Sequence, residues 1–467
     1  MCLLEAKKVE YSVSRDAISS LPDDMLAKIL SDLPTKLVVS TSVLSKRWRN
    51  LFSLMSSQHH YYLGDSDLLY HMVEIGGTYS YPFIVIKRDL HQKFRDFVGK
   101  TLSGCTSMKK LSLKCQDGLI SFPLVNKWIG IALDKGLVDL DLRLTTGEAK
   151  EANFFTNMTV FTNKTLVKLT LGIEIGDHLF LPYVFEVSLP VLKSLSIHGV
   201  WYICEHLCSI MLLGCPILEE LSLEYYIPSK RKRGVTWCVF AISHKSLKRL
   251  TVHQKSLLEN YRVTTLDTPS LVYLDFSGRA PTKLKSTANF VDSLVEAKLD
   301  VVMLEIPQRR AYLSTMINWI RNVKNLSLSC STVKEMYRSR MVVPSFVNLV
   351  KLSIESNTKQ GWQVLPSLLN KSPQLETLVL EGLHCISSEG VDIDPREVKV
   401  LEIHGFRGSF GEFRQCKHFL CQMKLLQVMK VEIDAVGDKK FQVTSDLLAL
   451  PFALPFKRAS KCKIQFL

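Results

Sequence analysis

A short apolar pattern, a loosened form of Leu-x-x-Leu-x-Leu, occurs thirteen times along this chain. The central residues of successive copies lie 23 to 30 positions apart. A unit of this length holds one strand and one return segment, and it buries its apolar side chains only against its neighbours. The pattern therefore predicts an elongated stack of units with a continuous core. The copies are Met108-Leu111-Leu113, Leu137-Leu140-Leu142, Leu166-Leu169-Leu171, Leu192-Leu195-Ile197, Leu218-Leu221-Leu223, Leu247-Leu250-Val252, Leu271-Leu274-Phe276, Leu294-Ala297-Leu299, Val323-Leu326-Leu328, Leu349-Leu352-Ile354, Leu375-Leu378-Leu380, Val398-Leu401-Ile403 and Val428-Val431-Ile433.

The units alternate a helix with a strand, most clearly at 209–223 and 365–380. In both segments the helix is expected to end at a residue suited to the left-handed conformation, Gly214 or Asn370, shortly before a proline. Right-handed stacking of such units places a parallel sheet inside and helices outside. The predicted fold class is thus α/β, an irregular right-handed leucine-rich-repeat solenoid that follows a three-helix N-terminal module.

Composition limits where such a chain works. Of the 467 residues, 46% are apolar and 22% charged, which is typical of a chain that is folded nearly throughout. No apolar run approaches the roughly 18 residues of a membrane span, and the first residues lack a secretory signal. The 12 cysteines are scattered without the spacing of small secreted domains. We therefore expect a chain with reduced thiols in the cytoplasm and/or nucleus, without membrane association.

The N-terminal module carries a recognisable motif. Pro22 suits a first helical turn, Asp23 and Asp24 favour the positive end of a helix, and Lys46 and Arg47 are expected to face water. The stretch SLPDDMLAKILSDLP at 20–34, followed by TSVLSKRWRNL at 41–51, resembles an F-box.

Later phrases extend the resemblance over most of the chain. KWIGIA at 127–132, CPILEEL at 215–221, the run 362–381 and VLEIHGF at 400–406 resemble plant F-box, leucine-rich-repeat and FBD-domain proteins. The predicted organisation is a disordered N-terminus at 1–15, an F-box at 16–55, a bridge capping the solenoid at 56–107, leucine-rich repeats at 108–345, C-terminal repeats with an FBD-like region at 346–436, and a C-terminal cap at 437–467.

The resemblance implies that the F-box docks onto the Skp-family adaptor of a ubiquitin ligase, and through it onto cullin and RING subunits, while the repeats select a protein substrate. An equally open interpretation of each single residue is that it forms the module's own core. The residues that would make or support the adaptor interface are Leu21, Pro22, Ile29, Leu30, Leu33, Pro34, Val43, Leu44 and Trp48.

Side-chain alternation predicts a substrate face. Residues that flank the second leucine of each copy point away from the core, onto the inner surface of the stack. Over the first six copies these positions hold five basic and four acidic residues, and over the last seven three basic and eight acidic ones. We therefore predict that a basic partner segment binds the C-terminal half of this surface. The proposed substrate-face residues are Arg249, Tyr273, Asp275, Glu355, Glu381, Glu402, Glu432 and Asp434.

Other classes of function are less well supported. The predicted inner surface carries little or negative charge, so the excess lysine and arginine behind the net charge of +14 must lie on loops and outer helices. This disfavours nucleic-acid binding on the inner surface. The run KRKR at 230–233 fits a nuclear import signal or, more commonly, a solvated loop. Cys204, His206, Cys208 and Cys215 are metal-ligand types, but their spacing in a helix spreads them around it. His198, His253 and His404 fall on the inner surface, where histidines usually neither titrate nor recognise a partner.

No nucleophile-base or phosphate-loop motif is present, so we expect a non-catalytic chain without a cofactor or a metal. The alternative functions are a repeat scaffold or ligand receptor that does not promote degradation, and nucleic-acid association through the basic outer surface.

Overall fold

The computed structural model describes most of the repeat region and parts of the N-terminal module. The described residues are 18, 20–31, 33, 35–41, 44–48, 51, 60–65, 88–115, 120–145, 159–174, 186–199, 210–225, 238–254, 261–281, 283–284, 293–302, 310–387, 390–393, 397–453 and 462–467. They fall into two compact units, Met1–Arg143 and Leu144–Leu467.

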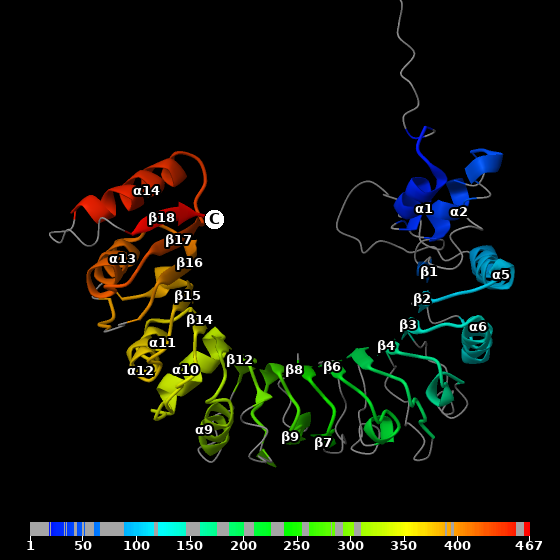
Figure 1. Cartoon of the computed structure of the whole chain (residues 1–467), viewed down its shortest axis with the longest axis horizontal. Coiled ribbons are helices and arrows are strands. Elements are labelled where there is room, and N and C mark those ends of the chain that lie inside the picture. Colours follow the sequence, from blue (N-terminus) through cyan, green and yellow to red (C-terminus); the bar gives the residue numbers. More distant parts are fainter. Residues whose placement is uncertain are drawn as a thin grey trace, which may run out of the picture. The chain divides into compact units, whose positions relative to one another are not determined.

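The first unit starts with short helices and continues with a repeating helix-strand pattern (Figure 1). Pro123 stands in the first turn of α6, where its missing N–H costs no hydrogen bond. The elements are α1 Asp23–Ser31, α2 Thr35–Thr41, β1 His60–Gly64, α5 Arg88–Gly104, β2 Lys110–Cys115, α6 Phe122–Asp134 and β3 Asp139–Thr145, which ends just beyond the boundary of the unit.

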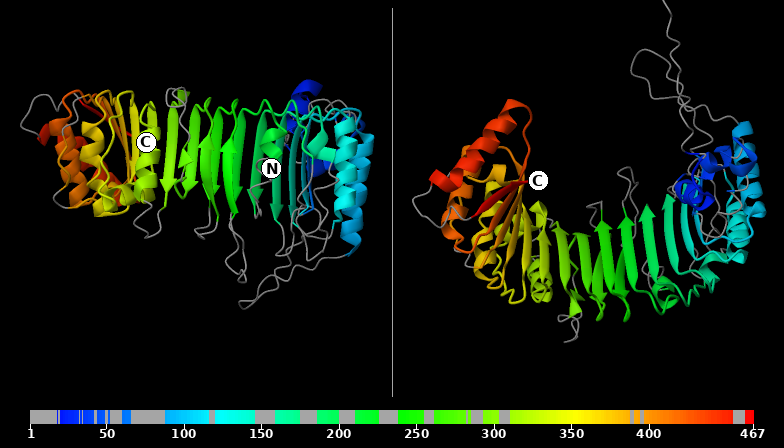
Figure 2. Two further views of the ribbon diagram at one scale, coloured as in Figure 1. Left: turned by 90° about the horizontal axis from the view of Figure 1, so that it is seen from below. Right: turned by 45° about the horizontal axis from the view of Figure 1, so that its top comes forward.

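In the second unit the main strands are stacked side by side and point in one direction (Figure 2). They are β4 Lys168–Glu174, β5 Ser194–Gly199, β6 Glu220–Tyr225, β8 Arg249–Gln254, β10 Tyr273–Gly278, β12 Glu296–Val301, β13 Asn325–Leu328, β14 Lys351–Glu355, β15 Thr377–Glu381, β16 Val400–Phe406, β17 Val428–Ile433 and β18 Lys463–Phe466.

The helices of the second unit are concentrated in its C-terminal half, on one side of the strands (Figure 1). They are α9 Arg310–Trp319, α10 Cys330–Arg338, α11 Lys359–Trp362, α12 Leu365–Asn370, α13 Phe410–Gln422 and α14 Asp438–Ala449, with 3-10 turns η2 Thr159–Thr162, η4 Leu383–Cys385 and η5 Leu450–Ala453.

The predicted fold class is confirmed: the described strands include a 15-stranded sheet, in which neighbours such as β1 and β2, β5 and β6, and β13 and β14 run parallel. Equivalent apolar residues of neighbouring units stand in register, as Leu326, Leu352 and Leu378 do on β13, β14 and β15. Leu352 and Leu378 are fully buried and Leu326 is nearly so, because each repeat covers the apolar face of the next repeat. The thirteen apolar copies correspond to β2 to β6, β8, β10 and β12 to β17.

The expectation of a helix in every return segment is wrong for part of the second unit. Strands β7 Cys238–Ser243, β9 Tyr261–Asp267 and β11 Lys283–Leu284 form a separate three-stranded sheet, with β9 in the middle. Their sequences, CVFAIS and YRVTTLD in the two longer strands, are rich in β-branched and aromatic residues, which favour extended structure over a helix.

The helix ends predicted at Gly214 and Asn370 have another cause than a left-handed residue. Asn370 is the last residue of α12, and Lys371 after it has a φ of −97°. Gly214 is required by close approach, since a Cβ there would lie 2.5 Å from atoms of Val187. The end of this helical turn lies so close to the backbone at Val187 that only glycine fits.

The apolar pattern did not predict strands β1 and β18, and it gave the wrong register for β17. β1 pairs in parallel with β2, and β18 pairs in parallel with β17, although neither carries the Leu-x-x-Leu-x-Leu signature. On β17 it is Met429 and Val431 that face Leu401 and Ile403, so the buried copy begins two residues earlier, at Leu426. The described helices include none that is both long and apolar enough to cross a membrane.

Candidate functional site

The helices that resemble an F-box pack around a core of their own. Leu26 and Leu30 of α1, Val38 of α2 and Leu51 are buried together. Three of the predicted adaptor residues, Leu21, Leu33 and Trp48, are partly buried against this core, and a fourth, Leu30, is part of it. These four side chains therefore have a structural role whatever else they contact.

A second set of apolar side chains in α1, in α2 and in the turn after α2 is exposed. Ile29 is 51% exposed and Leu44 67% exposed, and both were predicted to face the adaptor. Met25 (53%) and Leu37 (49%) are equally exposed but were not in the predicted interface. Met25 could have been found from its spacing, because it lies four residues before Ile29 and so on the same side of α1. Pro22 is exposed, and Pro34 and Val43 lie outside the described residues.

Arg47 is partly exposed, and it also has partners within the module that the sequence did not suggest. Its guanidinium donates to Asp23 Oδ1 at 2.7 Å and to the carbonyl oxygen of Leu21. Arg47 therefore fastens the later part of the module to the start of α1, where the first-turn carboxylate of Asp23 also favours the helix.

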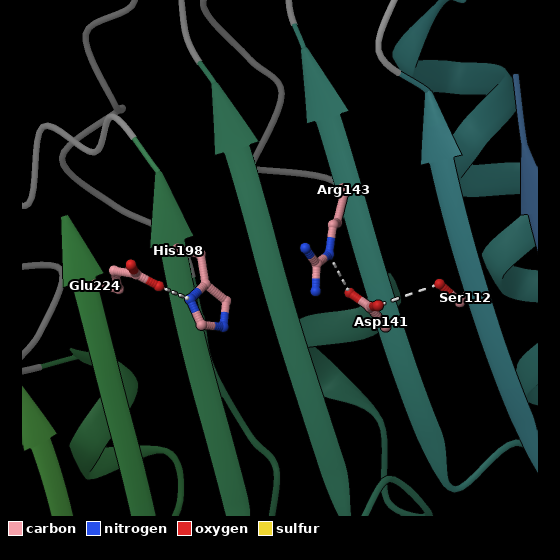
Figure 3. Close-up of polar contacts among 5 residues, drawn as sticks. All are labelled: Ser112, Asp141, Arg143, His198 and Glu224. Carbon is pink, nitrogen blue, oxygen red and sulfur yellow. Dashed lines mark hydrogen bonds and ion pairs between the residues drawn. The ribbon is translucent and has the colours of Figure 1, made fainter. Parts of the chain in front are cut away.

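In the first unit, β2 and β3 carry a small, partly buried polar network. The Asp141 carboxylate accepts from the buried Ser112 hydroxyl at 3.1 Å and from Arg143 Nε at 3.0 Å (Figure 3). Lys114 lies over the ring of Tyr62, with its Nζ 4.7 Å from the centroid. Asp141, Arg143 and Lys114 therefore each have a partner within the chain.

In the second unit, the residues between the buried ones form three rows across ten strands from β5 to β17, on what we call the open face. The N-terminal row is Ser194, Glu220, Arg249, Tyr273, Glu296, Asn325, Lys351, Thr377, Val400 and Val428. The middle row is Ser196, Ser222, Thr251, Asp275, Lys298, Ser327, Ser353, Val379, Glu402 and Lys430. The C-terminal row is His198, Glu224, His253, Ser277, Asp300, Ser329, Glu355, Glu381, His404 and Glu432.

All three histidines of the open face contact carboxylates. His198 Nδ1 lies 3.1 Å from Glu224 Oε2 (Figure 3), and His404 Nδ1 lies 2.8 Å from Glu432 Oε2. His253 Nε2 lies 3.0 Å from Asp275 Oδ1. Each pair links two neighbouring strands of the sheet, so these histidines have specific partners that sequence spacing did not suggest.

Tyr273 is at the centre of a charged cluster in the middle of the open face. The guanidinium of Arg249 lies 4.1 Å from its ring centroid, and Lys298 Nζ lies 5.6 Å from the same centroid. Burial alone would raise the pKa of Asp275, but the hydrogen bond and charge of His253, the charge of Lys298 and the Tyr273 hydroxyl outweigh it and hold that pKa below its usual value. Arg249, Tyr273 and Asp275 are thus brought together as parts of one cluster.

The remaining predicted face residues differ in their partners. Glu402 accepts from Lys430 at 2.7 Å, which lowers the pKa of the Glu402 carboxyl, and Asp434 accepts from Arg407 Nε at 3.0 Å. Among the described residues, Glu355 and Glu381 have no ion pair. The predicted acidic C-terminal half is therefore not uniform, because several of its charges are neutralised within the chain.

Gly382 brings Glu381 level with Glu355. It follows β15 with a φ of +79°, and a Cβ there would lie 2.4 Å from the carbonyl oxygen of Ser356. Only glycine allows this close turn. The turn also lets the Ser356 N–H donate to the Glu381 carbonyl at 3.0 Å.

The other candidate signals find little support or lie outside the described residues. Cys204, His206, Cys208 and the basic run 230–233 are among the residues that the structure does not describe. Cys215 is buried, which raises the pKa of its thiol to about 12. Among the described His, Cys, Asp and Glu side chains, no group of three is placed to hold a metal ion.

Comparison with known proteins matches both parts of the chain. A family model described as the At1g61320/AtMIF1 leucine-rich-repeat domain matches residues 101–404, and the F-box domain model matches residues 18–59. The putative F-box/LRR-repeat protein At5g25860 of Arabidopsis thaliana is 50% identical over 99% of this chain and 100% of its own length. The F-box/LRR-repeat protein At3g60040 of the same plant is 35% identical over 99% of this chain. This chain belongs to the plant family of F-box/leucine-rich-repeat proteins.

Proposed function

We propose that this protein is the substrate-recognition subunit of a Skp-cullin-F-box ubiquitin ligase. Its F-box binds the Skp-family adaptor, and through the adaptor it joins the cullin and RING subunits. The repeat units bind a protein substrate on the open face. The matches to the F-box and leucine-rich-repeat models support this division of roles.

The observation that carries the proposal is the set of exposed apolar side chains on the F-box helices. Met25, Ile29, Leu37 and Leu44 are about half exposed or more, although the module already has a core of its own. Leaving apolar side chains in water is unfavourable, and clusters of them on small modules usually mark protein interfaces. A permanent partner would remove this area from water.

The proposed mechanism is proximity. A receptor that holds a substrate lysine near a ubiquitin thioester raises the effective concentration of the two groups and supplies no reactive group itself. The chain is accordingly proposed to be a non-catalytic subunit that works without a cofactor. Its contribution is the fixed geometry of the stacked strands.

The test uses a substitution that changes the F-box surface but suits the helix. In Met25→Asp with Ile29→Arg, the acid lies near the start of α1 and the base near its end, four residues apart, which favours the helix. We expect the double variant to lose at least about tenfold in co-purification of a recombinant Skp-family adaptor, because charges would be buried without partners. The matched control is Val436→Asp with Phe441→Arg, at positions 89% and 78% exposed in the second unit.

The outcomes separate the alternatives. Adaptor capture that survives the F-box change contradicts the proposal and favours a repeat scaffold or ligand receptor without a role in degradation. Binding to an oligonucleotide that falls steeply with salt, and ignores the same change, favours nucleic-acid association.

Two finer assignments belong to the proposal. Residues 346–436 form an FBD-like region, supported by the phrases at 362–381 and 400–406. If residues 346–467 give no cooperative unfolding transition when expressed alone, they are a continuation of the repeats and not a separate domain. The site of action is the cytoplasm and/or the nucleus. Replacing the basic run 230–233 with glutamine in a fluorescent fusion should lower the nuclear fraction if that run is an import signal.

A further inference from the structure

We propose that the C-terminal row of the open face binds an extended, lysine- and arginine-rich segment of a protein, centred on Asp300, Glu355 and Glu381. The inference rests on the proposed function, because the segment would belong to the substrate that the repeats select. It also narrows the sequence-based prediction that a basic segment binds the C-terminal half of the inner surface.

The distribution of charge among the three rows is the first argument. The N-terminal and middle rows each hold two acidic and two basic residues, whereas the C-terminal row holds no lysine or arginine among its described residues and five carboxylates, Glu224, Asp300, Glu355, Glu381 and Glu432. The chain as a whole carries a net charge of +14. A single-sign row against a basic background selects a partner of the opposite sign.

The partners of these acids are the second argument. Elsewhere on the open face acids meet bases of the same chain, as Glu402 meets Lys430 at 2.7 Å. In the part of the chain that the structure describes, no lysine or arginine forms an ion pair with Asp300, Glu355 or Glu381. Asp300 instead accepts from two serine hydroxyls, Ser277 at 2.9 Å and Ser329 at 2.6 Å. Three carboxylates therefore stay available to a basic ligand.

The local field is the third argument. Glu355 and Glu381 stand directly opposite each other on β14 and β15, about one strand spacing of 4.8 Å apart. Like charges in this arrangement are unfavourable, and a cation between them would remove the repulsion. The nearby thiol of Cys330 is affected by the same negative charges. Burial raises the pKa of this thiol, and the charges of Glu355 and Asp300 raise it further.

The fourth argument is dimension. Asp300, Glu355 and Glu381 lie on β12, β14 and β15, and Ser329 directly follows β13, so Asp300 and Glu381 are three strand spacings, or about 14 Å, apart. An extended peptide advances about 3.3 Å per residue, and its side chains at positions one and five are about 13 Å apart on the same side. The middle row beside this stretch carries the small side chains Ser327 and Ser353, which leave the row accessible.

The experiment uses the full-length chain and two labelled peptides, four repeats of Gly-Arg and four repeats of Gly-Glu, with binding followed by fluorescence anisotropy at low salt. The test variant is Asp300→Asn, Glu355→Gln and Glu381→Gln. The matched control, Asp446→Asn, Glu186→Gln and Glu397→Gln, removes the same charge from exposed positions outside the three rows. Thermal unfolding of each variant shows that it is folded.

We expect the Gly-Arg peptide to bind the wild-type chain, to lose about tenfold in affinity in the test variant, equivalent to about 1.4 kcal/mol, and to lose less than about twofold in the control. Equal losses in both variants would show general electrostatic attraction and overturn the proposal. So would a wild-type chain that does not prefer Gly-Arg over Gly-Glu.

Adaptor capture from the same preparations keeps the two proposals apart. A chain that binds the adaptor but shows no selective peptide binding contradicts only the basic-segment proposal. A chain that binds the Gly-Arg peptide through the C-terminal row but ignores the adaptor contradicts the ligase proposal and leaves the row as a docking surface.

Discussion

The F-box helices and the open face of the second unit present opposite kinds of surface. The F-box helices expose Met25, Ile29, Leu37 and Leu44, which offer apolar area and little charge. In the three rows of the open face, no described residue is a large exposed hydrophobic one, and most charged groups there have partners. Apolar area gives affinity without much discrimination, whereas placed charges reject wrong partners. The difference suits one constant partner at the F-box and a selected one at the sheet.

The largest expected effects concern the two cores. Leu352→Ala empties a fully buried position between Leu326 and Leu378, and should lower the free energy of unfolding of the repeat unit by about 2–5 kcal/mol. Adaptor binding should stay within twofold of wild type, because the F-box core is separate. Leu26→Ala empties the F-box core instead and should reduce adaptor binding. Chemical denaturation of both variants measures their stability, and adaptor capture measures their binding. Loss of adaptor binding in Leu352→Ala would contradict the expectation that the F-box binds the adaptor independently of the repeats.

A smaller effect distinguishes the paired from the unpaired acids of the open face. Glu402→Gln breaks the contact with Lys430 and should cost about 1 kcal/mol, since the Glu402 side chain is only 18% exposed. Glu381→Gln removes a charge that faces Glu355, and should be neutral or stabilise the fold by a few tenths of a kcal/mol, on the order of one cross-strand pair. Urea denaturation gives both values. Equal destabilisation by the two changes would mean that Glu381 has a partner within the fold.

The sequence predicted the periodic parts of this molecule and missed the parts that depend on single contacts. Apolar residues at fixed spacing identified thirteen strands and the open face, because a buried strand must repeat its side-chain pattern. β1 and β18 were missed because strands at the two ends of the order β1 to β18 have one neighbour each, and so less need for the full signature. The outer strands β7, β9 and β11 were missed because helix was assumed in every return segment.

The candidate site, too, could be predicted from the sequence only where it follows the periodic pattern. Alternation placed Glu355, Glu381 and Glu402 on one face, but it could not show that Lys430 neutralises Glu402 and not Glu381, because Lys430 is 28 residues away in the chain. Likewise, helical spacing alone places Met25, Leu26, Ile29 and Leu30 close together on α1. The packing of Leu26 and Leu30 against Val38 and Leu51 is what leaves the other two exposed. Partners that come from distant repeats are set by the register of the strands.

The last expected effect is a pH dependence confined to the Tyr273 cluster, where a difference of about 1 kcal/mol at neutral pH should fall towards zero in acid. The pKa of Asp275 is lower in the folded chain than its ordinary value of 3.8, so the ionised carboxylate stabilises the fold. This contribution is fully present above the ordinary pKa and is lost as the pH falls below it, through the lower folded value. Asp275→Asn should therefore cost about 1 kcal/mol near neutral pH and progressively less in acid, so that the two stability curves converge below pH 3.8. Urea midpoints measured from neutral pH down into acid test this, with the exposed Asp446→Asn as control. A difference between wild type and Asp275→Asn that stays constant across the acid range would assign the effect to lost hydrogen bonds and not to charge.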